Sequence, residues 1–241
     1  MEYIIEHGNI VYYDTDAIVL PANRKLLEGP GTSKDIFSAA GRHQLTEACR
    51  ELGGCKVGMA VATPGYKLSA DYIIHAVVPR WKDGNHGEYD YLSSAYLSAL
   101  TLADVMKCKS IAFPLLSAGN NGFRKDIALE VACKSIESFS GENLETVKLV
   151  ILKEEVVVFI KSLGYDVVES EGYLQYKERK IEQNNRNKQA MKKGMKIAGD
   201  IAGVAIKIGI DYLMNENVQK TILKTGAQIV KGVLLKGKSK E

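Results

Sequence analysis

The stretch "SIAFPLLSAGNNGF", residues 110–123, carries the two features that decide the fold. Residues 110–116 form an apolar run typical of a buried strand. Residues 117–122 then consist of serine, alanine, two glycines and two asparagines, which have little side-chain bulk. Such a loop is typical of a tight turn, but it also lets backbone N–H groups approach a ligand and form a concave anion site. The stretch alone leaves both interpretations open.

The same alternation of strand and helix patterns runs through the first 171 residues. Apolar or alternating runs predict strands at 3–8, 16–21, 58–65, 71–79, 109–116 and 146–153, and an edge strand at 165–170. Helical spacing of apolar residues predicts helices over 35–52, 89–106, 125–139 and 154–163. The order predicts an α/β fold of three layers, with a mixed, largely parallel sheet between helices. Ligands bind such sheets at the carboxyl ends of the strands, where residues 117–123 fall.

A second loop of small residues follows another predicted strand. The segment "VLPAN", residues 19–23, leads to "GPGTS", residues 29–33, just before a helix expected to begin near Asp35. A helix N-terminus preceded by glycines suits phosphate, although Thr32 or Ser33 could simply cap the helix. The loop matches neither the Walker pattern nor the Rossmann glycine pattern. We expect the two loops to hold opposite sides of one diphosphate.

Composition and charge narrow the function classes. The net charge is +3, but residues 1–171 carry 17 Lys/Arg and 23 Asp/Glu, whereas residues 172–241 carry 15 and 6. The acidic body lacks a basic strand with interleaved aromatics, so nucleic acid is not an expected partner. The four cysteines form no C-x-x-C pair and no signal-peptide pattern is visible, so we expect a cytoplasmic protein with no metal and no cofactor.

Six blocks, in order over about residues 3–170, resemble the macro domain family, whose members bind ADP-ribose. They are "HGNI", "DAIVLPAN", "LLEGPGTSKDIFSAAG", "ELGGCKVGMAVATPGYKL", "YIIHAVVPRW" and "SIAFPLLSAGNNGF". The resemblance implies that the loop 117–123 wraps the distal phosphate and ribose. The residues that it implies as ligand contacts are Asn9, Ile10, Asn23, Gly31, Thr32, Ser33, Ile36, Ser117, Ala118, Gly119, Asn120, Asn121, Gly122, Phe123 and Leu152.

The chain also departs from the family pattern. Asn9 stands where the family has an adenine-contacting Asp, so a hydrogen bond to the base would lack charge assistance. Leu20 replaces the first Asn of the family's N-A-A-N, and Leu152 replaces an aromatic that often stacks on adenine. Ser33 stands where hydrolytic members place a water-holding Asp. Asp35, two residues on, is either its substitute or only a partner of the helix dipole.

The resemblance implies binding of ADP-ribose or a derivative of it, either on an ADP-ribosylated protein or as an NAD-derived metabolite. The alternative is hydrolysis of an ADP-ribosyl or O-acyl-ADP-ribose bond, with Asn23 and Asp35 as the candidate catalytic residues. His75, within an apolar strand, is expected to be a hydrogen-bonded core residue.

The C-terminal part has a different character. We expect a macro domain over residues 1–171, a charged linker over 172–194, and an apolar and amphipathic helical hairpin over 195–241. The hairpin could pack on the domain, assemble into a homo-oligomer, or associate with a membrane surface through residues 195–236. Asp200, Lys207 and Asp211 would each cost about 2.5–3.5 kcal/mol in a bilayer centre, which disfavours an isolated span. A further alternative is therefore a sensor whose tail oligomerises or engages membrane on ligand binding.

Overall fold

The computed structural model describes residues 1–174, 177–178, 181–182 and 184–189. The chain divides into two units, Met1–Lys177 and Glu178–Glu241. The described residues of the second unit are helical, and the predicted hairpin over 195–241 lies outside the described residues. Within the part of the chain that is described, no helix has the length and apolarity needed to cross a membrane.

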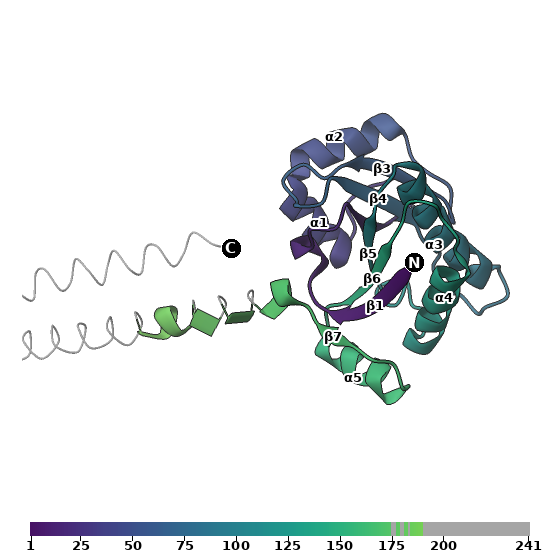
Figure 1. The fold of residues 1–241 in the computed structure, drawn as a ribbon. Helices are drawn as coiled ribbons and strands as arrows, with labels where there is room; N and C mark the ends of the chain where they lie inside the picture. Colours follow the sequence, from purple (N-terminus) through teal and green to yellow (C-terminus); the bar gives the residue numbers. More distant parts are fainter. Residues whose placement is uncertain (175–176, 179–180, 183, 190–241) are drawn as a thin grey trace, which may run out of the picture. The chain divides into compact units, whose positions relative to one another are not determined.

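The first unit is built on a seven-stranded sheet with the strand order β3-β4-β2-β5-β6-β1-β7 (Figure 1). The strands are β1 (Glu2–His7), β2 (Ala17–Ala22), β3 (Ala60–Pro64), β4 (Tyr72–Val77), β5 (Ser110–Pro114), β6 (Thr146–Ile151) and β7 (Val168–Glu169). Only β3 pairs antiparallel with its neighbour; the other pairs are parallel. Each predicted strand is present, and β7 lies at the sheet edge as predicted.

Helices cover both faces of the sheet, which confirms the predicted three-layer α/β fold. The short 3-10 helix η1 (Ile10–Tyr12), α1 (Thr32–Ala40) and α2 (Arg42–Leu52) lie on one face, and α3 (Glu88–Val105) and α4 (Lys125–Ser138) on the other (Figure 1). The helix α5 (Glu154–Ser162) contributes to the same core as α3 and α4.

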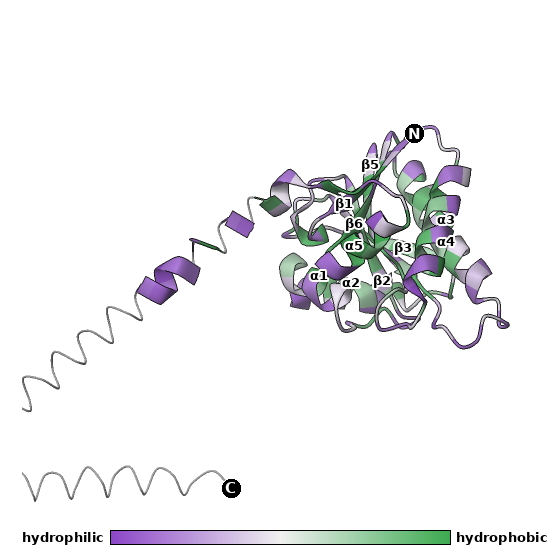
Figure 2. Cartoon of the chain, turned by 90° about the horizontal axis from the view of Figure 1, so that it is seen from below, coloured by the Kyte–Doolittle hydropathy of each residue, from purple (hydrophilic) through white to green (hydrophobic). Residues whose placement is uncertain are grey.

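The strands supply both cores because successive side chains point to opposite faces. In β2, Ala17 and Val19 pack with α3 and α4, whereas Ile18 and Leu20 pack with α1 and α2. Figure 2 shows the hydrophobic residues gathered in the strands and on the inner sides of the helices. With both faces buried, the strand ends are the part of the sheet left to bind a ligand.

The single helix predicted over 35–52 is wrong, because two helices meet at Gly41. Gly41 has φ +102°, and a Cβ there would lie 2.9 Å from the side-chain Oε1 of Gln44. The first helix also begins earlier than predicted, at Thr32, with Gly31 at the N-cap and no side chain capping it. The alternative in which Thr32 or Ser33 caps the helix is therefore wrong.

His75 lies in the core, as expected. Its side chain is fully buried and its Nε2 lies 2.9 Å from Thr63 Oγ1. Burial disfavours the imidazolium and lowers the pKa of His75 to about 4. The ring is therefore a neutral structural group at physiological pH.

We predict that His75 makes the fold sensitive to mild acid. The unfolded chain binds a proton below its ordinary pKa of 6.5, whereas the folded chain does so only near 4, so stability falls as the pH falls between these values. Between about pH 7 and about pH 5 the loss through this group is about 2 kcal/mol. Urea unfolding of wild type and His75→Gln at both pH values measures it.

The matched control for this measurement is His43→Gln, because His43 is exposed on α2. We expect the pH dependence of unfolding to shrink in His75→Gln and to stay as in wild type in His43→Gln. Equal pH dependence in wild type and His75→Gln would contradict the assignment.

Candidate functional site

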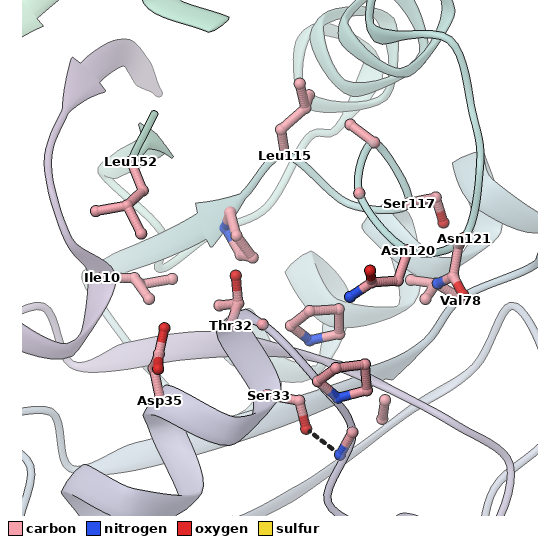
Figure 3. A pocket seen from close by; sticks show the side chains of 18 of the residues that line it. Ile10, Thr32, Ser33, Asp35, Val78, Leu115, Ser117, Asn120, Asn121 and Leu152 are labelled. Carbon is pink, nitrogen blue, oxygen red and sulfur yellow. Dashed lines mark hydrogen bonds between the residues drawn. The ribbon is translucent and has the colours of Figure 1, made fainter. Parts of the chain in front are cut away.

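A cleft of about 1090 Å³ opens at the carboxyl ends of the parallel strands. Its walls come from the residues that end or follow β1, β2, β4, β5 and β6, together with the start of α1 (Figure 3). The volume is that of a site for a ligand of nucleotide size. The strand order thus places the two small-residue loops in one cavity.

The two loops face each other across this cleft. A Cβ built on Gly31 would lie 3.5 Å from the side-chain Nδ2 of Asn120. Gly31 has φ +68° and ψ −135°, a backbone conformation that is essentially confined to glycine. Because both loops line one open cleft, the expected opposition of the turns at positions 31 and 119 is present.

The loop over 117–123 is held in shape by its own hydrogen bonds. Ser117, at φ +62°, donates its hydroxyl to the carbonyl of Pro79 at 3.1 Å. The N–H of Gly122 donates to Gly119 O at 3.0 Å, and the N–H of Phe123 donates to Ser117 O at 3.2 Å. Among the described residues, no group accepts from the N–H groups of residues 118–121. These four amides are therefore available to an anion.

The facing wall offers a second set of amides. The N–H groups in the first turn of α1 have no acceptor within the helix, and the helix dipole makes this end positive. Ser33 lies in this first turn, and its side chain is buried. Its hydroxyl accepts a hydrogen bond from the N–H of Gly29 at 3.0 Å (Figure 3). Ser33 thus closes the loop that leads into the helix.

Five cations line the cleft: Arg24, Lys25, Arg80, Lys125 and Lys153. The lining acids are Asp35 and Glu155, and Lys153 Nζ lies 3.7 Å from Glu155 Oε1. This excess of positive charge suits a dianionic diphosphate. The five cations are not among the residues predicted from the sequence. A usable signal was that Arg24 and Arg80 come within three residues of the predicted strand ends.

One end of the cleft is apolar. Figure 3 shows Ile10 and Leu152 together with Asp35 at this end, separated from Ser117, Asn120 and Asn121 at the other. Asn9, which also lines the cleft, caps η1 by accepting from the N–H of Val11 at 3.3 Å. A planar base could pack on the aliphatic side chains of Ile10 and Leu152.

The two candidate catalytic residues, Asn23 and Asp35, both line the cleft. Asn23 Oδ1 accepts from the N–H groups of Lys25 (3.1 Å) and Leu27 (3.2 Å), and its Nδ2 donates to Leu27 O. Only one N–H of this amide is left for a ligand. Asp35 lines the cleft at its apolar end, away from the loop over 117–121 (Figure 3). The structure does not bring Asp35 to the loop assigned to the distal ribose.

Three of the predicted ligand contacts do not line the cleft: Ile36, Gly122 and Phe123. Ile36 is fully buried because it faces the core from α1. Phe123 is 3% exposed, and its ring packs against that of Trp81 with centroids 5.0 Å apart. The other predicted contacts all line the cleft. Gly122, at φ +81°, and the buried Phe123 therefore support the shape of the loop and do not face the cleft.

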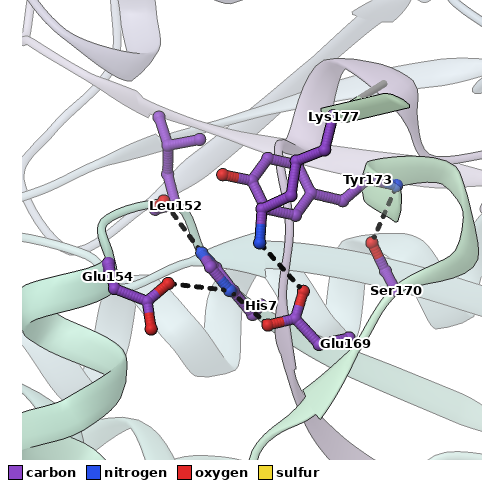
Figure 4. Close-up of polar contacts among 7 residues, drawn as sticks. All are labelled: His7, Leu152, Glu154, Glu169, Ser170, Tyr173 and Lys177. Carbon is purple, nitrogen blue, oxygen red and sulfur yellow. Dashed lines mark hydrogen bonds and ion pairs between the residues drawn. The ribbon is translucent and has the colours of Figure 1, made fainter. Parts of the chain in front are cut away.

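Behind Leu152 lies a cluster around the buried His7 (Figure 4). His7 Nε2 lies 3.3 Å from the carbonyl of Leu152, which can only accept, so Nε2 donates. Nδ1 lies 2.8 Å from Glu169 Oε1 and 3.5 Å from Glu154 Oε2. The ring also contacts Tyr173 at 4.7 Å between centroids. Through these contacts His7 connects Leu152, at the apolar end of the cleft, with Glu169 of β7 and with Tyr173 after it.

The side chains of His7, Glu154 and Glu169 could offer ligand atoms to a metal, since these atoms lie within 4.8 Å of one another. However, both ring nitrogens of His7 already have protein partners. We assign the cluster to the support of the cleft wall.

The fold and the cleft define a class: an α/β protein with a cationic cleft, flanked by two loops of small residues, at the carboxyl edge of its sheet. The family model described as Macro domain matches residues 19–132. A macro domain-containing protein of Listeria monocytogenes is 41% identical over 177 residues, covering 70% of this chain and all of the relative. The chain belongs to the macro domain family.

Other relatives and solved structures agree. A macro domain-containing protein of Mesorhizobium japonicum is 47% identical over 55% of this chain and 74% of its own length. The O-acetyl-ADP-ribose deacetylase 1 of Pantoea vagans is 42% identical over 61% of this chain and 90% of its own length. The Oceanobacillus iheyensis macrodomain with ADP superposes with a TM-score of 0.62 at 32% identity, covering 67% of this chain and 89% of that chain.

We predict that the two facing glycines respond differently to a methyl group. Gly31→Ala places a Cβ on a backbone that only glycine adopts readily, so it should cost about 1–3 kcal/mol of folding free energy. Gly119 has an ordinary φ and no atom within 4 Å of an added Cβ, so Gly119→Ala should change stability by less than about 0.5 kcal/mol. Urea unfolding of the two variants tests this. A larger loss for Gly119→Ala would contradict the described loop geometry.

Proposed function

We propose that this chain binds ADP-ribose, or a ligand that carries it, in the cleft between residues 31–33 and 118–121. The observation that carries the proposal is that two loops of small residues face each other across one cavity. Residues 118–121 of one loop carry backbone N–H groups with no acceptor among the described residues. Among the relatives of known structure, the Oceanobacillus iheyensis macrodomain was solved with ADP. The Trypanosoma brucei macrodomain was solved in complex with ADP-ribose and superposes with a TM-score of 0.58 at 29% identity.

The proposed pose follows from the two ends of the cleft. The diphosphate lies between the first turn of α1 and the amides of residues 118–121, which donate to its oxygens. The adenine packs on Ile10 and Leu152. The side-chain oxygen of Asn9 accepts a hydrogen bond from the adenine amino group, without the charge assistance that an Asp would give. The distal ribose lies towards Ser117, Asn120 and the remaining N–H of Asn23. The lining cations favour the charged ligand electrostatically.

A second candidate function is hydrolysis of O-acyl-ADP-ribose or of an ADP-ribosyl bond. It is favoured by the relative from Pantoea vagans, which bears the name O-acetyl-ADP-ribose deacetylase 1. Since Ser33 supplies no carboxylate, the ligand's own phosphate would accept the proton of water. The 118–121 loop and Asn23 would position that water, so that the rate would come mainly from geometry.

The partners of the tail extend the proposal beyond the cleft. The net charge of +9 over residues 172–241, from 15 Lys/Arg and 6 Asp/Glu, supports an anionic partner such as a membrane surface. The apolar periodicity of 195–236 supports assembly into a homo-oligomer. In either form the chain would act as a sensor of an ADP-ribose ligand.

We predict that Gly119→Glu abolishes ADP-ribose binding while the fold is retained. A Cβ at position 119 meets no atom of the protein within 4 Å, so the change is compatible with the fold, but a glutamate there adds bulk and a carboxylate to the lining of the cleft. Isothermal titration calorimetry should show a loss of affinity of at least about a hundred-fold, on the order of 2.7 kcal/mol. Ser140→Glu, an exposed position after α4, is the charge-matched control and should bind as wild type. Equal heats from both variants would remove the site assignment.

For the hydrolase alternative, we predict that Asn23→Ala and Asp35→Ala differ in their rates of turnover. Asn23 shapes the turn beside the distal end, so its loss should slow turnover of O-acetyl-ADP-ribose by about a hundred-fold. Asp35 lies at the apolar end of the cleft, so Asp35→Ala should leave the rate within about two-fold. Product release measured by chromatography tests this. A larger loss of rate in Asp35→Ala would support a catalytic role for that carboxylate. If the wild-type protein shows no turnover, hydrolysis is rejected and binding remains as the function.

A further inference from the structure

The loop over 117–123 is supported from outside by Trp81. The backbone N–H of Trp81 donates to Asn121 O at 2.8 Å. Its Cβ lies 3.7 Å from the place where Gly122 would carry a side chain, and its ring packs edge-on against Phe123 at 5.0 Å and 66°. Trp81 therefore contacts three successive residues at the end of the cleft loop. It touches this loop without lining the cleft itself.

Glu88, at the start of α3, organises the loop that carries Trp81. Its Oε1 accepts from the backbone N–H groups of Lys82 (3.1 Å), Asp83 (3.3 Å) and Gly84 (3.2 Å). Its Oε2 accepts from the N–H of His86 at 2.6 Å. The side chain is only 2% exposed. One carboxylate therefore accepts from four backbone N–H groups within residues 82–86, and no other group of this described loop does so.

The ionised state of this carboxylate is the one that the loop requires. Burial would raise the pKa of Glu88, but hydrogen bonds from the backbone N–H groups of Glu88, His86, Gly84 and Lys82 outweigh it and lower the pKa to about 2. At physiological pH the group is an acceptor on both oxygens, which matches donors on both sides.

We propose that Glu88 is a positioning residue for the ligand: its carboxylate sets the position of Trp81, and Trp81 sets the position of the amides of residues 118–121. This inference rests on the proposed function. Without the Glu88 carboxylate, the ligand would have to order the loop over 117–123 as it binds. The free-energy cost of that ordering would weaken binding.

Asp104 provides a matched control within the same helix. It accepts from the N–H groups of Glu142 (3.2 Å), Asn143 (2.7 Å) and Leu144 (2.9 Å), and so organises the loop that precedes β6. It lies at the other end of α3, about 24 Å from Glu88 along a helix that rises 1.5 Å per residue. Neither Asp104 nor its three partners line the cleft. Both carboxylates accept hydrogen bonds from the backbone of a loop, but only the loop of Glu88 leads to the residue that supports the 117–123 loop.

The experiment compares Glu88→Gln with Asp104→Asn in the full chain. Each change replaces one acceptor oxygen by an NH2 group that opposes backbone donors. Calorimetry gives the Kd for ADP-ribose at a temperature where circular dichroism shows both variants folded. Amide hydrogen exchange of Trp81, Gly122 and Phe123, followed by NMR without ligand, reports the order of the loop.

We expect Glu88→Gln to weaken ADP-ribose binding roughly three- to ten-fold and to speed exchange at these three amides. Asp104→Asn should change neither. Equal weakening by both variants, or unchanged exchange in Glu88→Gln, would overturn the inference. If Glu88→Gln does not fold, Trp81→Ala removes the contact with Phe123 while keeping the bonds of Glu88. Binding by Trp81→Ala as tight as wild type would also overturn it.

The two proposals fail in different ways. If wild type does not bind ADP-ribose, the proposed function fails, and the exchange rates still decide whether Glu88 orders the loop. If wild type binds and Glu88→Gln binds equally well, the function stands and the positioning role is lost.

Discussion

The structure depends on parallel strands that are buried on both faces and end at one edge of the sheet. A buried strand satisfies its N–H groups in the ladder, but the residues that follow it do not. After β5, residues 118–121 carry amides with no acceptor among the described residues, and the first turn of α1 presents the same deficit opposite them. Both loops lack side-chain bulk and line one cleft, so a diphosphate bound there would satisfy these donors.

The two glycines at this site, Gly31 and Gly119, are needed for different physical reasons. Gly31 is required by its own backbone conformation, whereas Gly119 has ordinary angles and an empty surrounding. The first glycine therefore serves the fold, and the second keeps the cleft open. Rigid support comes from elsewhere: Ser33 closes the loop that enters α1, and Trp81 contacts the end of the loop after β5. The free amides are thus arranged before a ligand arrives, which lowers the entropic cost of binding.

The sequence predicted the strands, the three layers and the two loops because these follow from local periodicity and from glycine content. It did not predict that Gly41 divides one apolar pattern into two helices, since the break is set by one backbone angle. It also assigned Phe123 to the ligand, although Trp81, which lies 42 positions earlier, draws that ring into the core. The lining cations were missed because the cleft that they share forms only in the folded chain, although Arg24 and Arg80 closely follow predicted strand ends. Glu88 was missed because its burial and its four backbone donors depend on the shape of the loop that precedes α3.

The most direct test of the diphosphate assignment is a titration of the ¹⁵N-labelled chain with ADP-ribose, followed by amide NMR shifts. The largest shifts are expected at residues 31–33 and 118–121, with smaller shifts at Ile10 and Leu152 and almost none at Asn143 or Leu144. Shifts concentrated outside the two loops, or amides at 31 and 119 that do not respond at saturation, would contradict the claim that backbone donors from both loops hold one ligand.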